Sequence, residues 1–64
     1  MLVQWTCSAN PHRVFEHIVP EATVSAALAY CRALPPGSWG TGIFDPEGNQ
    51  LADEAHIAHL LACH

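Results

Sequence analysis

Three clusters of turn-forming residues constrain this chain of 64 residues more than any other feature of its sequence. They are Asn10-Pro11, Pro35-Pro36-Gly37 and Asp45-Pro46-Glu47-Gly48-Asn49. Each cluster combines residue types that favour tight turns, so the segments between them must be short strands or short helices. No internal repeat or low-complexity tract divides the sequence further, and we expect residues 1–64 to form a single small domain.

The segments on either side of the first cluster predict two strands. In residues 2–7, Val3, Trp5 and Cys7 alternate with less apolar positions, which is typical of a strand with one buried face. Residues 13–19 are rich in Val, Ile and Phe, which favour strands. Two strands joined by a short turn predict an antiparallel hairpin.

After this hairpin the apolar spacing changes to that of a helix. The apolar positions of the stripe are Val24, Ala27, Leu28, Cys31 and Leu34. This spacing places them on one helix face, so we expect the Cys31 thiol to lie in the core. Thr23 is placed to cap the first turn. The prolines after Leu34 disfavour helical backbone and predict the end of the helix.

The second half of the chain predicts two short strands and one ambiguous segment. Residues 40–44 favour a strand, and residues 50–52 can return antiparallel to it after the turn at Asp45. Residues 55–62 consist of Ala, His, Leu and Ile, a composition that favours a helix. Their apolar residues also alternate as in a strand, so periodicity leaves both alternatives open.

Two of these segments resemble a known family. Residues 20–28, with the sequence Pro-Glu-Ala-Thr-Val-Ser-Ala-Ala-Leu, resemble the end of the hairpin and the start of the helix in the RnfH family, also described as RatB. Gly42-Ile43-Phe44 followed by Gln50-Leu51 resembles its third strand and the return. The resemblance covers roughly residues 2–53 and implies an α+β chain with the β-grasp, or ubiquitin-like, fold, ββαβ(β). It also implies an accessory role near an electron-transport complex or in a toxin–antitoxin pair.

The family closes its sheet with a last strand that lies centrally, beside the first. The residues of this chain that can take that place are 56–61, with the sequence His-Ile-Ala-His-Leu-Leu. We therefore favour a strand over this stretch, with a helix as the alternative.

Composition and charge exclude several classes of partner. The net charge is −4, with two arginines and no lysine, so the chain has no basic face for nucleic acid. No apolar run is long enough to span a membrane, and no signal peptide is visible. Three widely spaced cysteines do not form a disulfide framework. We therefore expect a cytoplasmic protein.

Apolar content points instead to a protein partner or a second copy of this chain. Only 12% of the residues are charged, where about 25% is ordinary, and 50% are hydrophobic. Some apolar surface is therefore expected to face another chain. The aromatic residues that we single out as partner-binding anchors are Trp39, Phe44 and Phe15. We expect no catalytic residue and no cofactor, hence an interaction module or a small accessory subunit, including one that completes the active site of a larger enzyme.

The alternative function is metal binding by the end of the chain. If residues 55–62 form a helix, His56 and His59 lie one turn apart and Cys63 follows on the same face. Imidazole and thiolate are ligands that suit zinc, copper or nickel. A strand would separate the two histidines onto opposite faces, so the conformation of this segment distinguishes the two functions.

Overall fold

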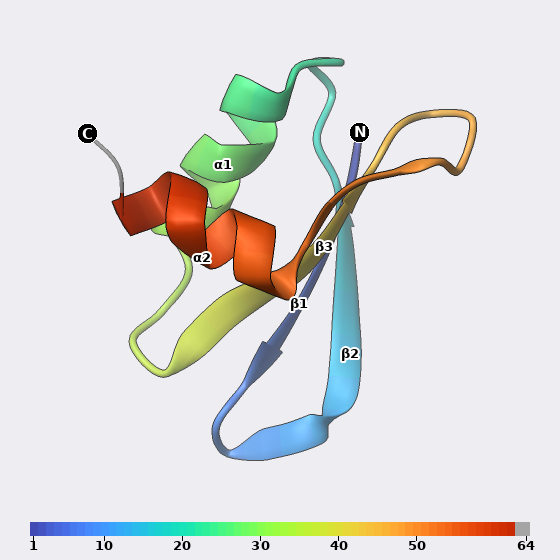
Figure 1. Cartoon of the computed structure of the whole chain (residues 1–64). Helices are drawn as coiled ribbons and strands as arrows, with labels where there is room; N and C mark the ends of the chain where they lie inside the picture. Colours follow the sequence, from blue (N-terminus) through green and yellow to red (C-terminus); the bar gives the residue numbers. More distant parts are fainter. Residues whose placement is uncertain (63–64) are drawn as a thin grey trace.

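The computed structural model describes residues 1–62 and shows the element order ββαββα (Figure 1). The elements are β1 (Leu2–Cys7), β2 (Asn10–Ile18), α1 (Val24–Arg32), β3 (Ser38–Phe44), β4 (Gln50–Asp53) and α2 (Glu54–Ala62). The predicted hairpin, the helix after it and the two short strands are confirmed, although β2 begins three residues earlier than expected. The chain is a small α+β protein with one four-stranded sheet.

The four strands lie in the order β2-β1-β3-β4, and every neighbouring pair is antiparallel. Strand β1 is therefore internal, with β2 on one side and β3 on the other. Leu2 is opposite Ile18 in β2 and opposite Phe44 in β3, so the three residues form a row across the sheet. Strands β2 and β4 form the two edges.

Helix α1 begins and ends where its sequence signals place it. The hydroxyl oxygen of Thr23 accepts a hydrogen bond from the backbone N–H of Ala26 at 3.2 Å, which confirms the predicted cap. The last helical residue is Arg32, shortly before the two prolines. Cys31 is 6% exposed, as predicted, and burial raises the pKa of its thiol.

Residues 54–62 form helix α2, so the strand that the family resemblance favoured there is wrong and the helical alternative is correct. Asp53 caps this helix, because its Oδ1 accepts a hydrogen bond from the backbone N–H of His56 at 2.8 Å. Ile57 is only 1% exposed and Leu61 packs against the same core, which is the i, i+4 spacing of one helix face.

The helical tail also changes the centre of the sheet. The resemblance predicts a closing strand beside β1, but β3 occupies that position and pairs with β1 directly. His59 shows why the alternating pattern gave the wrong prediction for this segment. A strand would place it beside Ile57 in the core, whereas in α2 it is exposed.

The core lies between the sheet and the two helices, which cover the same face (Figure 1). Its largest fully buried side chains are Val3, Ile43 and Ile57. Gly40 allows β3 to approach the helices closely, because a Cβ at this position would lie 2.8 Å from the Sγ of Cys31. Within residues 1–62, neither helix has the length and apolar content needed to cross a bilayer.

Candidate functional site

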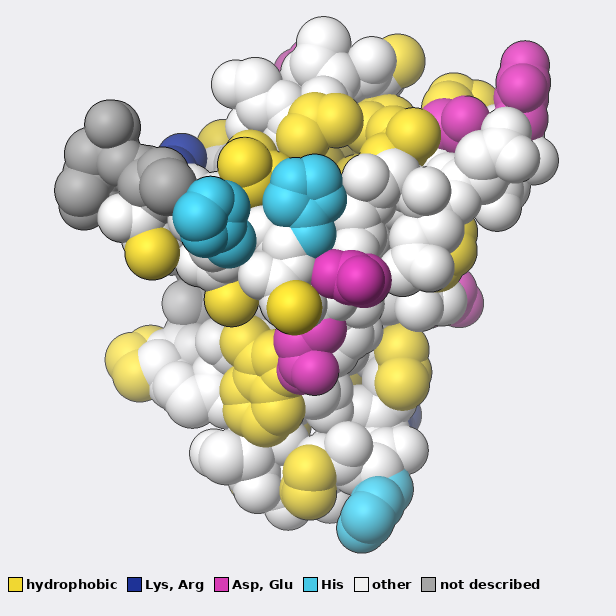
Figure 2. Space-filling model, in the orientation of Figure 1, with side chains coloured by type: hydrophobic (Ala, Val, Ile, Leu, Met, Phe, Trp, Pro, Cys, Tyr) yellow, Lys and Arg dark blue, Asp and Glu magenta, His cyan; other side chains and the backbone are white. Residues whose placement is uncertain are grey.

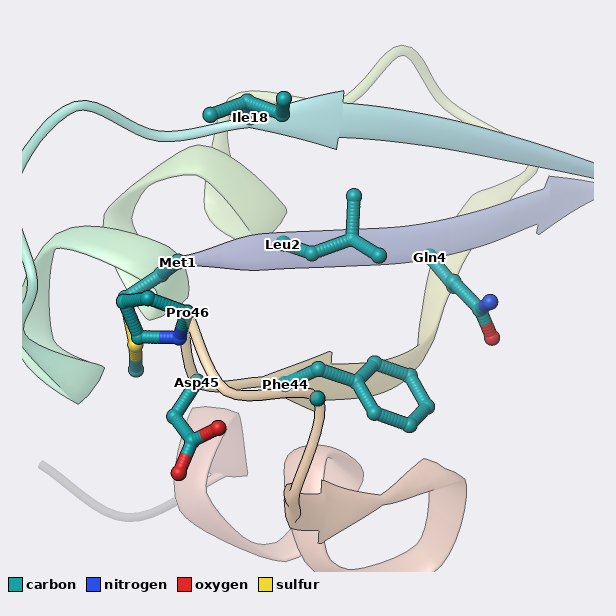
Figure 3. Close-up of a pocket in the computed structure, with 8 residues that line it drawn as sticks. Met1, Leu2, Gln4, Ile18, Phe44, Asp45 and Pro46 are labelled. Atoms are coloured by element: carbon teal, nitrogen blue, oxygen red, sulfur yellow. The ribbon is translucent and has the colours of Figure 1, made fainter.

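The face of the sheet opposite the helices carries an apolar groove with a volume of about 570 Å³ (Figure 3). The view in Figure 3 looks onto this open face, with both helices behind the strands. The residues that line the groove come from β1 and the residue before it, from β2, from β3 and from the turn after β3. They are Met1, Leu2, Gln4, Ile18, Phe44, Asp45, Pro46 and Gly48. A volume of this size lies within the range of ordinary ligand sites, about 300–1,000 Å³.

The floor of the groove is the apolar row that crosses three strands. Ile18, Leu2 and Phe44 extend side by side from β2, β1 and β3 (Figure 3). Ile18 is 73% exposed, a large value for an aliphatic side chain. Strand alternation explains the arrangement, since Val3 and Ile43, the next residues along β1 and β3, face the helices and are fully buried.

The Phe44 ring lies against the sheet because a glycine makes room for it. A Cβ at Gly42 would lie 2.9 Å from Cε1 of Phe44, so the ring occupies the space that a side chain would fill on the open face. Gly42 is opposite Gln4 in β1, a groove residue. The glycine thus lets the ring of Phe44 extend along the sheet surface.

A hydrogen-bonded acidic turn borders the groove next to Phe44. Oδ1 of Asp45 accepts hydrogen bonds from the backbone N–H groups of Asn49, at 2.8 Å, and Glu47, at 2.9 Å. These bonds, that from Asn49 first, hold the pKa of the Asp45 carboxyl below its ordinary value. Gly48 adopts a φ of 89°, a backbone conformation that glycine reaches without steric cost. The groove therefore has a permanent negative charge at this border.

The opposite border is also acidic. Glu16 lies two residues before Ile18 on the same face of β2, and its Oε2 accepts a hydrogen bond from Nε2 of Gln4 at 3.1 Å. Both arginines lie elsewhere: the guanidinium of Arg13 stacks over the Phe15 ring at 4.9 Å, and Arg32 is in the last turn of α1.

The structure does not bring the three predicted anchors together. Phe44 lines the groove. Phe15 stacks on Trp5 with a centroid distance of 4.5 Å, so its ring is half covered by the chain itself. Trp39 is 37% exposed, and its indole N–H donates to Oε1 of Glu54 at the start of α2.

The predicted metal ligands lie on α2. His56 and His59 are exposed and one turn apart, and Figure 2 shows histidine side chains at the surface over this helix. Cys63 lies outside the described residues. Within residues 1–62, no three His, Cys, Asp or Glu side chains are grouped closely enough to hold a metal ion.

Sequence reasoning missed Leu2 and Ile18 as site residues. Alternation places Leu2 on the less apolar face of the first strand, and the pattern of residues 13–19 does not select a buried face for Ile18. Their pairing with each other and with Phe44 depends on the contact between β1 and β3, which is distant in sequence. The usable signal was the presence of aliphatic residues on both faces of the first hairpin.

Comparisons with protein families, with characterised proteins and with solved structures found no match to this chain. The geometry of the sheet and its open face therefore carries the functional interpretation.

Proposed function

We propose that this chain is a non-catalytic protein–protein interaction module, or a small accessory subunit of a larger complex, that binds its partner through the open face of the sheet. The observation that carries the proposal is the apolar row Ile18, Leu2 and Phe44 in a groove that no part of residues 1–62 covers. Burying one aliphatic side chain contributes about 1.5–3 kcal/mol, so a partner that covers this row gains a large driving force.

The polar groups of the groove support binding in preference to catalysis. The Asp45 carboxylate is engaged by the backbone of its own turn, and Glu16 is paired with Gln4. A catalytic acid or base needs a free position beside the reacting atom and a pKa suited to proton transfer. These carboxylates serve instead to hold the turn and to set the charge at the border of the groove.

A relation to β-grasp domains and to the RnfH family is part of the same proposal. The order of hairpin, helix and second hairpin supports it, as does the packing of α1 on one face of the sheet. The direct pairing of β1 with β3 is the departure that such a relation must accommodate. We place the protein in the cytoplasm, which agrees with the free thiols of Cys7 and Cys31.

Native mass spectrometry of the chain isolated from the cells that produce it tests the proposal. We expect a complex of defined stoichiometry, with a different protein or with a second copy, that is lost in Ile18→Glu and kept in Val14→Glu. Val14 is a matched control, because it lies on the same strand, is 55% exposed and does not line the groove. A free chain under all conditions would contradict the proposal. If the partner is an enzyme that needs this chain for activity, the chain acts as an accessory subunit.

Metal binding is the second candidate, and the helical conformation of residues 54–62 is the observation that favours it. It places His56 and His59 on neighbouring turns, which can provide two imidazole ligands to one ion. Zinc titration followed by calorimetry would show binding that His56→Gln weakens at least about tenfold, as expected for loss of a direct ligand. His12→Gln, at the far end of the sheet, is the control; equal binding by both variants would contradict a site on α2.

A further inference from the structure

We propose that the occupant of the open-face groove is an amphipathic helix of a partner protein, with apolar residues on successive turns and basic residues at its ends. This inference rests on the proposed function and names the chemistry of the partner. Three features of the groove carry it: the direction of its apolar row, the spacing of that row, and the sign of the charges on its borders.

The apolar row crosses the strands instead of running along one of them. Ile18, Leu2 and Phe44 belong to three neighbouring strands and are direct partners in the sheet. A peptide strand added to the free edge of β2 would run parallel or antiparallel to the strands, so it would extend the sheet and leave this row uncovered. A segment that lies across the strands covers all three side chains.

The spacing of the row fits a helix. Neighbouring strands are about 4.8 Å apart, so the three side chains are spaced at about 5 Å and span about 10 Å. Residues three or four apart on a helix advance about 4.5–6 Å along its axis, and residues seven apart advance about 10.5 Å. Alternate residues of an extended peptide are about 6.8 Å apart and lose register with the row at the second step. Positions i, i+3 or i+4, and i+7 of a helix therefore match Ile18, Leu2 and Phe44.

The charges at the borders select basic flanks. Glu16 lies at the β2 border, and Asp45 and Glu47 lie in the turn at the other border. No guanidinium offsets them on this face, and the Met1 ammonium donates to the carbonyl of Val19 at 3.1 Å in a buried position. Lysine or arginine at either end of a bound helix would complement these acids.

The same charges disfavour a second copy of this chain in the groove. Packing two open faces together would bring Glu16, Asp45 and Glu47 of one copy near the same acids of the other. The chain as a whole has a net charge of −4, which adds long-range repulsion. A basic amphipathic partner avoids both the local and the long-range repulsion.

Titration of isotope-labelled protein with two synthetic helical peptides, followed by NMR, tests this inference. Both peptides carry leucine at positions i, i+4 and i+7; one has lysines at its ends and the other has glutamates. We expect the lysine peptide to bind at least about tenfold more tightly and to shift the resonances of Leu2, Gln4, Ile18 and Phe44. Ile18→Glu should weaken binding at least about tenfold, whereas Val14→Glu should not.

Three outcomes would overturn the inference: no binding of the lysine peptide at millimolar concentration, equal affinity of the two peptides, or shifts confined to the edge of β2 or to the helices. A negative result in the peptide titration is distinguishable from a failure of the proposed function. A stoichiometric complex in native mass spectrometry that needs Ile18 would preserve the interaction module while excluding a basic helix as its ligand.

Discussion

The two faces of the same sheet have opposite roles, although they are built from alternate residues of the same strands. On the helix-covered face, Val3 and Ile43 are 0% exposed. On the open face, the adjacent residues Leu2 and Phe44 line a groove, and Ile18 beside them is 73% exposed. Folding therefore buries only one of the two apolar faces, and the second face is available for binding.

Size explains why one apolar face is left uncovered. A chain of about 60 residues buries only about 60% of the surface that its unfolded form exposes. Helices α1 and α2 are each nine residues long, enough to cover one side of a four-stranded sheet. No part of residues 1–62 covers the open face. Substitutions on the two faces can therefore separate residues needed for folding from residues needed for binding.

The largest expected difference is between two isoleucines on opposite faces. Ile43→Ala removes a fully buried side chain and should lower the free energy of unfolding by about 2–5 kcal/mol. Ile18→Ala should change it by less than about 0.5 kcal/mol, because this side chain is already in solvent. Urea unfolding measures both. Where Ile43→Ala fails to fold, Ile43→Val, with an expected loss of about 0.5–1.5 kcal/mol, replaces it. Equal losses at both positions would contradict the division of the two faces.

The two helices differ in how well the sequence predicts them. Helix α1 could be predicted because its signals are local: the apolar stripe, the cap at Thr23 and the prolines after Leu34. Helix α2 was misjudged because its residues satisfy both periodicities, and the burial of Ile57 decides between them through tertiary contact. The neglected local signal was Asp53, an excellent capping residue immediately before the segment.

The candidate site was less predictable than the fold. Phe44 could be selected as an aromatic residue at the end of a short strand, but its place beside Leu2 depends on β1 pairing with β3. Sequence order does not reveal such a long-range pairing, and the family resemblance predicted a different neighbour for β1. The predicted anchor Phe15 illustrates the same limit, since its stacking on Trp5 follows from the register of the hairpin.

Two glycines of β3 provide a second comparison of the faces. Alanine at Gly40 would place its Cβ 2.8 Å from the Sγ of buried Cys31 and 3.3 Å from Ile57, so we expect a loss of about 1–3 kcal/mol. Alanine at Gly42 would place its Cβ 2.9 Å from the edge of the Phe44 ring and 3.4 Å from Nε2 of Gln50, and both of these side chains can move toward solvent. We expect a change of less than about 1 kcal/mol there. Thermal unfolding of both variants checks this order, and the reverse order would contradict the assignment of faces.

Loss of the α1 cap should have a smaller effect on stability, confined to the helices that cover one face of the sheet. Thr23→Ala removes the acceptor for the Ala26 N–H and should cost about 1 kcal/mol of stability. Thr23→Ser keeps the hydroxyl and is the matched control. Urea unfolding monitored by circular dichroism measures the difference, while peptide binding to the groove should be unchanged by either variant. Equal stability of the alanine and serine variants would exclude a capping role.

The smallest expected effect concerns pH and the turn that borders the open face. The pKa of Asp45 is lowered in the folded state, so its carboxylate stabilises the fold above the pKa of the unfolded chain, and this stabilisation is lost as pH falls through the folded pKa. Stability should therefore decrease below about pH 4. Asp45→Asn should show a weaker pH dependence in that range. An identical acid transition in both proteins would contradict the role of this carboxylate.

Photocrosslinking in living cells tests the central claim, that a partner protein covers the open face, most directly. Benzoylphenylalanine is introduced in place of Ile18 in one variant and in place of Val14, on the same strand outside the groove, in the other. The account predicts that position 18 crosslinks to one defined partner protein and that position 14 does not. Crosslinking of equal strength at both positions, or at neither, would contradict a binding surface centred on the groove of the open face.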